Sequence, residues 1–336
     1  MDKNNIGNIL TECKLPDTCE QKKLEETHIS WVLISDHYAY KVKKPVKYNF
    51  VDYSTLEKRK YFCEKEVELN KRLAPGMYLG TASITNDGIV TGDEAKDSAL
   101  DYAVMMKKMD SEKKMDVLLE KNKVSENDIL KLAQKIATFH QKSLPIKNTF
   151  SSEEFKKDYN DIESIRGLIE EKIGKNWYDK VEECIETSNH YLNLSKMYLN
   201  ERVIAGFTRD GHGDLTARNI FLYDEDPVIF DCIEFNDDFR KIDVLNDIAF
   251  LCVDLDYYGK ENLGRLFYQQ YLKAFGSEQS EQIDQLLAYY KSYRANIRAK
   301  VTLISIQNNG DASQSVEKAI KYLELMYQYM HEYMLT

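Results

Sequence analysis

Short apolar runs separated by turn residues fill the first third of the chain. His28–Ile34 is rich in β-branched and aromatic side chains, Ser35–His37 has the composition of a turn, and Tyr38–Lys43 forms a second run. Two such runs joined by a short polar segment predict a β-hairpin. Further strands are expected at residues 78–85, 88–91 and 101–106.

One helix is predicted among these strands, over residues 54–73. Either Ser54 or Thr55 can cap its first turn, and Pro75 with Gly76 stops it. Apolar side chains recur near the helical period on one face, at Leu56, Phe62, Cys63, Leu69 and Leu73.

From residue 111 onward the pattern becomes helical. Ser125 can cap a helix that runs to His140, two charged helices are expected within 151–200, and further helices fill 261–335. The chain is therefore expected to have two parts, a strand-rich part over 1–110 and a mainly helical part over 111–336.

The stretch 203–235 interrupts the helical part and has a different pattern. It predicts three short β segments, Val203–Phe207, Asn219–Tyr223 and Val228–Asp231. A polar loop, Arg209–Arg218, separates the first two, and Asp224–Pro227 has turn composition.

Three oxygen-bearing side chains gather in this stretch. Asp214 lies in the loop, Asn219 starts the second β segment, and Asp231 ends the third. A hairpin brings the start of one strand near the end of the other, so these groups are expected to cluster. Carboxylate and amide oxygens without nearby Cys or His ligands suit Mg²⁺ rather than Zn²⁺, and Mg²⁺ so bound keeps sites for phosphates.

An isolated H-x-D triplet is common, but the ordered set H-x-D-x-x-x-x-N, strand, turn and strand ending in Asp is rare. It has the order of a kinase catalytic loop and metal hairpin. With the phrases ETHISWV, YKVKKPV, STLEKRKYFCEKE, LNKRLAP, HGDLTARNI and FDCIEFN, the chain resembles the aminoglycoside phosphotransferase-like branch of the kinase fold. It most resembles uncharacterised bacterial phosphotransferases, some of which carry an additional ATP-binding domain.

The resemblance implies an α+β, bilobal protein-kinase-like fold. The small N-lobe would hold an antiparallel sheet and one long helix, and the helical C-lobe would carry catalytic loop 209–219 and metal hairpin 219–236. Protein kinases also have a glycine-rich loop ahead of the phosphate lysine, and this chain has none there.

The resemblance also implies roles for individual residues. Asp214 would be the catalytic base, and Asn219 and Asp231 the magnesium ligands. Lys41 would hold nucleotide phosphates, with Lys43 as the alternative. The implied partner of that lysine is Glu66, with Glu64 close behind. The remaining implied roles are Lys108 and Met109 in an adenine-binding connector, Asp247 as a brace for the catalytic loop, and His140 as a structural residue.

Composition narrows the class of protein. The net charge of −10 argues against a general nucleic-acid binder. The six cysteines form no C-x-x-C pair, so free thiols are expected. No signal segment or membrane-length apolar run occurs, which favours a cytoplasmic protein without a membrane partner.

The sequence therefore predicts a phosphotransferase dependent on ATP and Mg²⁺ that acts on a hydroxyl group of a small molecule. The acceptor would be aminoglycoside-, sugar- or choline-like. Two other functions stay open, a catalytically idle kinase-fold nucleotide-binding or regulatory module and transfer of the nucleotide moiety. The identity of the acceptor, the choice between ATP and GTP, any antibiotic resistance and the oligomeric state are not fixed by the sequence.

Overall fold

The computed structural model describes residues 1–92, 98–147, 150–309 and 312–334. Contacts divide the chain into two compact units. The first unit comprises Met1–Val117 and Asn219–Arg240, and the second comprises Leu118–Arg218 and Lys241–Thr336. The fold is α+β and protein-kinase-like, with an antiparallel sheet in the N-terminal part and a mainly helical C-terminal part.

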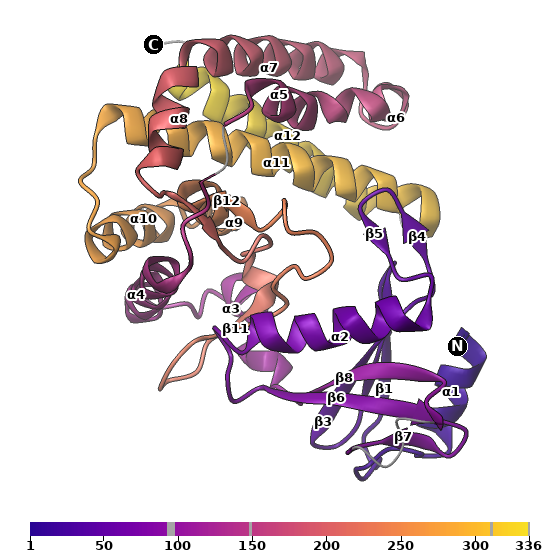
Figure 1. Cartoon of the computed structure of the whole chain (residues 1–336). Helices are drawn as coiled ribbons and strands as arrows, with labels where there is room; N and C mark the ends of the chain where they lie inside the picture. The colour runs from indigo at the N-terminus through magenta and orange to yellow at the C-terminus, as the bar shows by residue number, and fades with distance from the viewer. Residues whose placement is uncertain (93–97, 148–149, 310–311, 335–336) are drawn as a thin grey trace. The chain divides into compact units, whose positions relative to one another are not determined.

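The first unit is built on an antiparallel sheet with strand order β1-β2-β3-β8-β6-β7 in the described part of the chain (Figure 1). The predicted hairpin is present, because β2 pairs with β3 from Ser30↔Lys43 to Ile34↔Ala39. The strands of this sheet are β1 (Lys23–Glu26), β2 (Ser30–Ile34), β3 (Tyr38–Lys43), β6 (Tyr78–Thr85), β7 (Gly88–Val90) and β8 (Asp101–Lys107).

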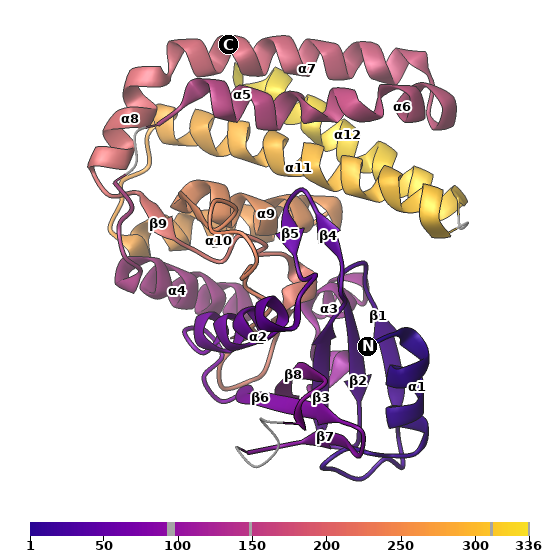
Figure 2. The same ribbon diagram turned by 45° about the vertical axis from the view of Figure 1, so that its right-hand side comes forward.

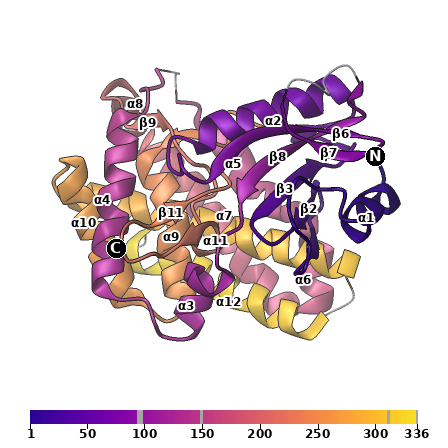
Figure 3. The ribbon, with the colours of Figure 1, turned by 90° about the horizontal axis from the view of Figure 1, so that it is seen from below.

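Helices cover this sheet. The predicted long helix is α2 (Leu56–Asn70), which lies along β8 and β6 (Figure 3). Its N-cap is Thr55, whose side chain accepts a hydrogen bond from the backbone N–H of Lys58. Helix α1 (Lys3–Thr11) lies beside β1 and β2 (Figure 2), and the short strands β4 (Lys47–Tyr48) and β5 (Val51–Asp52) precede α2.

The hairpin of β10 (Ile220–Phe221) and β11 (Val228–Ile229) belongs to the first unit. This division differs from the expected boundary at residue 110, which assigned the hairpin to the helical part. The physical reason is that β10 contacts the chain just after β8: Leu222 donates its backbone N–H to the carbonyl of Lys113, and Lys114 forms a β-bridge with Phe221.

The second unit is mainly helical. The predicted helix over 125–140 is α4 (Glu126–Lys142), and Ser125 and Asp128 form a capping box at its start. The long helices α11 and α12 lie side by side, and α7 packs against α12 (Figure 2). The other elements are α5 (Ser152–Asn160), η3 (Asp161–Ile165), α6 (Arg166–Lys172), α7 (Lys175–Leu194), α8 (Lys196–Ile204), α9 (Val244–Tyr257), α10 (Glu261–Phe275), α11 (Glu281–Asn309) and α12 (Ala312–Met334).

Three short elements lie where the two units join in sequence. These are η2 (Ser111–Lys113), α3 (Met115–Glu120) and η4 (Ala217–Asn219). Two of the three points where the chain passes from one unit to the other, after Val117 and after Arg218, therefore fall within helical turns, and the third follows Arg240.

The expected strand Val203–Phe207 is wrong. Val203 lies in helix α8, because the apolar residues there pack at helical spacing, and Gly206 ends the helical segment with φ +81°. The strand starts later, as β9 (Thr208–Asp210), which pairs with β12 (Lys241–Asp243). Helix α9 begins directly after β12, at Val244.

The cysteine prediction is partly wrong. Cys13 and Cys19 form a disulfide with their Cα atoms 5.9 Å apart, because the turn that follows α1 brings them together. Cys63, Cys184, Cys232 and Cys252 form no disulfide within the described residues, as expected, and all four are buried. Within the described residues, no helix has the length and apolar character needed to cross a membrane.

Candidate functional site

Lys41 on β3 lies at the centre of a charged cluster in the first unit. Its Nζ is 2.9 Å from Oε1 of Glu66 on α2 and 2.6 Å from Oδ1 of Asp231, just after β11. Three of the residues singled out from the sequence are therefore in direct contact, although they are far apart in the chain.

Lys43 extends this cluster inward. Alternate residues of a strand share one face, so Lys41 and Lys43 both face α2. The Nζ of Lys43 is 2.7 Å from the second oxygen of Glu66 and also donates to Glu234. Glu234 accepts a further hydrogen bond from the hydroxyl of Tyr53 at 2.5 Å.

The ionisation of the cluster follows from burial and charge together. Burial alone would lower the pKa of Lys41, but the carboxylates of Asp231 and Glu66 outweigh it and raise that pKa well above its ordinary value. Burial likewise opposes the charge of Glu234, and the two lysines hold its pKa below the ordinary value. At neutral pH Lys41 is therefore protonated and Glu234 is ionised.

Asp231 has an unusual backbone conformation. Its φ is +64°, a left-handed value that Asp and Asn adopt more readily than other side chains. The backbone N–H of Asp231 donates a hydrogen bond to the hydroxyl of Tyr78, at 3.1 Å. This conformation changes the direction of the chain just after β11.

Asn219 lies at the same end of the hairpin as Asp231. Ile220 pairs with Ile229, and the backbone N–H of Phe230 donates to the carbonyl of Asn219 at 3.0 Å. Asn219 is buried, whereas the Asp231 side chain is 40% exposed. Within the described residues no group of three or more His, Cys, Asp or Glu could hold a metal, so the hairpin end offers an amide and a carboxylate rather than a closed cage.

The predicted connector follows β8, which extends one residue further than expected, to Lys107. The backbone N–H of Lys108 donates to the carbonyl of His37 in the β2–β3 turn. Met109 is partly buried against the apolar cluster beneath α2 and contacts Tyr223. The structure thus ties the connector to the hairpin turn, and the adenine role of Lys108 and Met109 stays a prediction.

In the second unit, Asp247 of α9 holds the loop that carries Asp214. Its carboxylate accepts the backbone N–H groups of His212 at 2.7 Å and Gly213 at 2.9 Å. His140 of α4 contacts the same carboxylate at 3.0 Å and Tyr271 at 2.8 Å. Asp247 and His140 are fully buried, so both are structural supports of the loop, in line with the sequence prediction.

Asp214 itself is partly exposed. Its carboxylate is 2.9 Å from Nη2 of Arg218, four residues later. Burial tends to raise the pKa of Asp214, but the charges of Arg218, Arg298 and His212 outweigh it and lower that pKa. Asp214 is therefore ionised at neutral pH.

Asp254, which was not singled out from the sequence, also supports this loop. Its Oδ2 accepts the backbone N–H of Ala217 at 2.8 Å. On α11, Arg294 is buried and donates to the carbonyl of Asn246, while Arg298 contacts Asp254 and Tyr322. Asp254 follows Asp247 by seven residues on α9, a spacing that returns to the same helical face and could have served as a signal.

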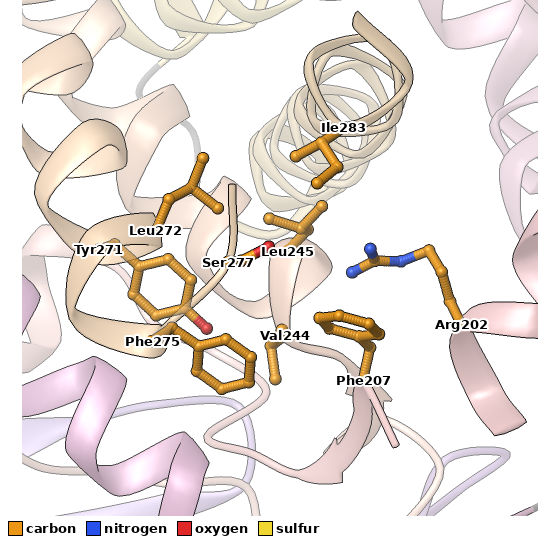
Figure 4. Close-up of a pocket in the computed structure, with 9 residues that line it drawn as sticks. All are labelled: Arg202, Phe207, Val244, Leu245, Tyr271, Leu272, Phe275, Ser277 and Ile283. Atoms are coloured by element: carbon orange, nitrogen blue, oxygen red, sulfur yellow. The ribbon is translucent and has the colours of Figure 1, made fainter. Parts of the chain in front are cut away.

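A small cavity in the second unit is not a candidate site (Figure 4). Its lining is apolar apart from Arg202, Tyr271 and Ser277, and Arg202 forms a buried bidentate pair with Asp243. The cavity has a volume of about 10 Å³, which is enough for about one water molecule. It is a gap in the packing of the helices.

Replacing Asp247 by Asn is expected to destabilise the second unit. The carboxylate receives two backbone N–H groups and His140, and an amide cannot accept all of them, so we expect a loss of roughly 2–4 kcal/mol in the free energy of unfolding. Burial tends to raise the pKa of Asp247, but the contacts with His140 and His212 outweigh it and lower that pKa. The carboxylate therefore stabilises the fold at neutral pH, and this contribution is lost as the pH falls below about 4. The difference in free energy of unfolding between wild type and variant, measured with a denaturant, should therefore become smaller as the pH is lowered to about 3.

Asp179→Asn is the matched control, because Asp179 is an exposed aspartate of the same unit. An Asp247→Asn variant as stable as this control would contradict the supporting role.

Comparison of sequences finds relatives of this chain among mycobacterial proteins. No family model matches the chain. Uncharacterised proteins of Mycobacterium tuberculosis and Mycobacterium bovis are 27% identical to it over 311 residues, which cover 91% of this chain. The matched region makes up 59% of the length of each of those relatives.

Solved structures extend the comparison. A choline/ethanolamine kinase family protein from Mesorhizobium loti superposes with a TM-score of 0.57 and 13% identity, covering 99% of this chain and 95% of that one. An amicoumacin kinase in complex with AMP-PNP and Ca²⁺ has a TM-score of 0.57 and 12% identity, covering 98% and 94%. At such identities the likeness concerns the fold, and the chain therefore has the kinase-like fold of small-molecule phosphotransferases.

Proposed function

We propose that this chain is a phosphotransferase dependent on ATP and Mg²⁺ that moves the γ-phosphate to a hydroxyl group of a small molecule. The observation that carries the proposal is the contact of Lys41 with both Glu66 and Asp231. A strand lysine paired with a helix glutamate and followed by a metal-binding aspartate is the arrangement that kinases use for nucleotide phosphates. The kinase-like fold of the similar structures, one of them with AMP-PNP, adds support.

The residues of the first unit suit a magnesium-bound nucleotide. Asn219 and Asp231 supply hard oxygen atoms at one hairpin end, and a carboxylate that is 40% exposed can reach a ligand. Mg²⁺, when bound, offsets the negative charge of the phosphates and of the transferred group. Lys41 holds phosphate oxygens of the nucleotide, and Glu66 keeps Lys41 in place.

The residues of the second unit suit the acceptor. Asp214 is ionised at neutral pH, so its carboxylate can orient the acceptor hydroxyl and accept its proton. Asp247 and Asp254 fix the backbone around Asp214 and thereby its position. In this proposal Lys108 and Met109 contact the adenine, and the acceptor is an aminoglycoside-, sugar- or choline-like hydroxyl compound.

A screen of hydroxylated small molecules with the wild-type chain, ATP and Mg²⁺ tests the proposal. We expect ADP to form in the presence of at least one acceptor, and mass spectrometry of that acceptor to show an added phosphate. An acceptor carrying AMP would instead establish nucleotidyl transfer. Binding of Mg·AMP-PNP with no turnover of ATP by any acceptor would favour an idle nucleotide-binding module.

A further inference from the structure

The charged cluster of the first unit continues beyond the residues that the proposed function uses. Five side chains of alternating charge follow one another in contact, in the order Asp231, Lys41, Glu66, Lys43 and Glu234. Glu66 gives one carboxylate oxygen to each lysine. The tail after β11, residues 231–234, therefore contacts β3 at two points. Asp231 pairs with Lys41, and Glu234 pairs with Lys43.

The two halves of this cluster differ in exposure. The side chains of Lys41 and Asp231 are 14% and 40% exposed, whereas those of Lys43 and Glu234 are 1% and 4% exposed. A nucleotide phosphate therefore has access to Lys41 but not to Lys43. Lys43 must act on the protein itself.

Stability alone does not account for the buried half. Removing two charges from water costs several kcal/mol per ion, and apolar residues of similar volume are often as stabilising as a buried ion pair. What an ion pair adds over apolar packing is a defined geometry.

We propose that Lys43 and Glu234 are positioning residues, which hold Lys41 and Asp231 in the arrangement that a magnesium-bound triphosphate requires. This inference rests on the proposed function. Lys43 fixes the second oxygen of Glu66, so that the carboxylate cannot turn without breaking one of its two ion pairs. Glu234 fixes the tail three residues after Asp231, and so limits how far Asp231 can move away from β3.

Two variants test this inference, Lys43→Met and the milder Glu234→Gln, which keeps the size of the side chain. The first measurement is calorimetric titration of each folded variant with Mg·AMP-PNP. We expect roughly tenfold weaker binding for Lys43→Met, which is about 1.4 kcal/mol, and a smaller loss for Glu234→Gln, because residues of one ion-pair network are energetically coupled. Adding Glu234→Gln to Lys43→Met should weaken binding little further, because both changes break the same contact.

The second measurement needs no nucleotide. Acylation of Lys41 by a small reagent, followed by peptide mass spectrometry, is expected to be faster in Lys43→Met, because Glu66 is then free to turn away. Lys44→Met is the matched control, since Lys44 is the next residue, pairs with Glu26 and lies outside the cluster. It should leave both measurements unchanged.

The outcomes are distinct. Unchanged Mg·AMP-PNP affinity and unchanged Lys41 acylation in Glu234→Gln and Lys43→Met would overturn the positioning role. If Lys43→Met does not fold, Glu234→Gln alone decides. A wild-type chain that binds no Mg·AMP-PNP would contradict the proposed function, and the acylation measurement would still decide whether Lys43 positions Lys41.

Discussion

Replacing Asp214 by Asn is expected to abolish most phosphate transfer while leaving nucleotide binding intact. The carboxylate that accepts the acceptor proton is lost, and general base catalysis of this kind contributes roughly 10²–10⁴-fold to the rate. The amide keeps the size of the side chain and can still accept a hydrogen bond from Arg218, so the loop should stay in place. The rate of ADP formation with the acceptor identified by the screen, together with the affinity for Mg·AMP-PNP, measures both effects.

The exposed Asp179 again supplies the control substitution, Asp179→Asn, which should leave the rate unchanged. Full activity in Asp214→Asn would show that the base lies elsewhere. A parallel fall in nucleotide affinity would show instead that Asp214 contributes to nucleotide binding.

The second large effect is expected for Asp231→Asn. Substitution of partners that only support metal ligands typically costs about 10–100-fold in metal affinity, so loss of a charged ligand should reach at least the upper end, about 100-fold. Asn is the suitable replacement because it tolerates the left-handed backbone at φ +64°. The measurement is the affinity for AMP-PNP with and without Mg²⁺, and the loss should be confined to the magnesium-bound nucleotide.

Asp238→Asn provides the control, because Asp238 is an exposed aspartate in the same segment of the first unit. Equal losses of affinity with and without Mg²⁺ in Asp231→Asn would mean that Asp231 acts through Lys41 alone. The magnesium role would then be wrong.

The elements that the sequence predicted best are those with local signals. The β2–β3 hairpin, α2 with its Thr55 cap, and α4 with its capping box are present because pattern and capping chemistry act over a few residues. The expected contact of Lys41 with Glu66 is present as well. Their roles toward the nucleotide remain predictions.

The errors have local causes that the sequence pattern could not resolve. The apolar run at Val203 fits a helix as well as a strand, and only the pairing of β9 with β12, more than 30 residues later in the chain, decides where the strand begins. The disulfide of Cys13 with Cys19 depends on the turn after α1 rather than on residue spacing. The contact of Lys43 with Glu234 spans 191 residues and has no local signal.

The assembly of the first unit from two separate stretches has a consequence for how such a chain can be produced. Residues 1–117 alone would carry Lys41, Lys43 and Glu66 but neither Asp231 nor Glu234, and would leave two clustered lysines with a single carboxylate. Uncompensated buried charge is costly, so a gene fragment ending there would encode an unstable product. The first unit can therefore complete its charged cluster only after residues 219–240 have been synthesised.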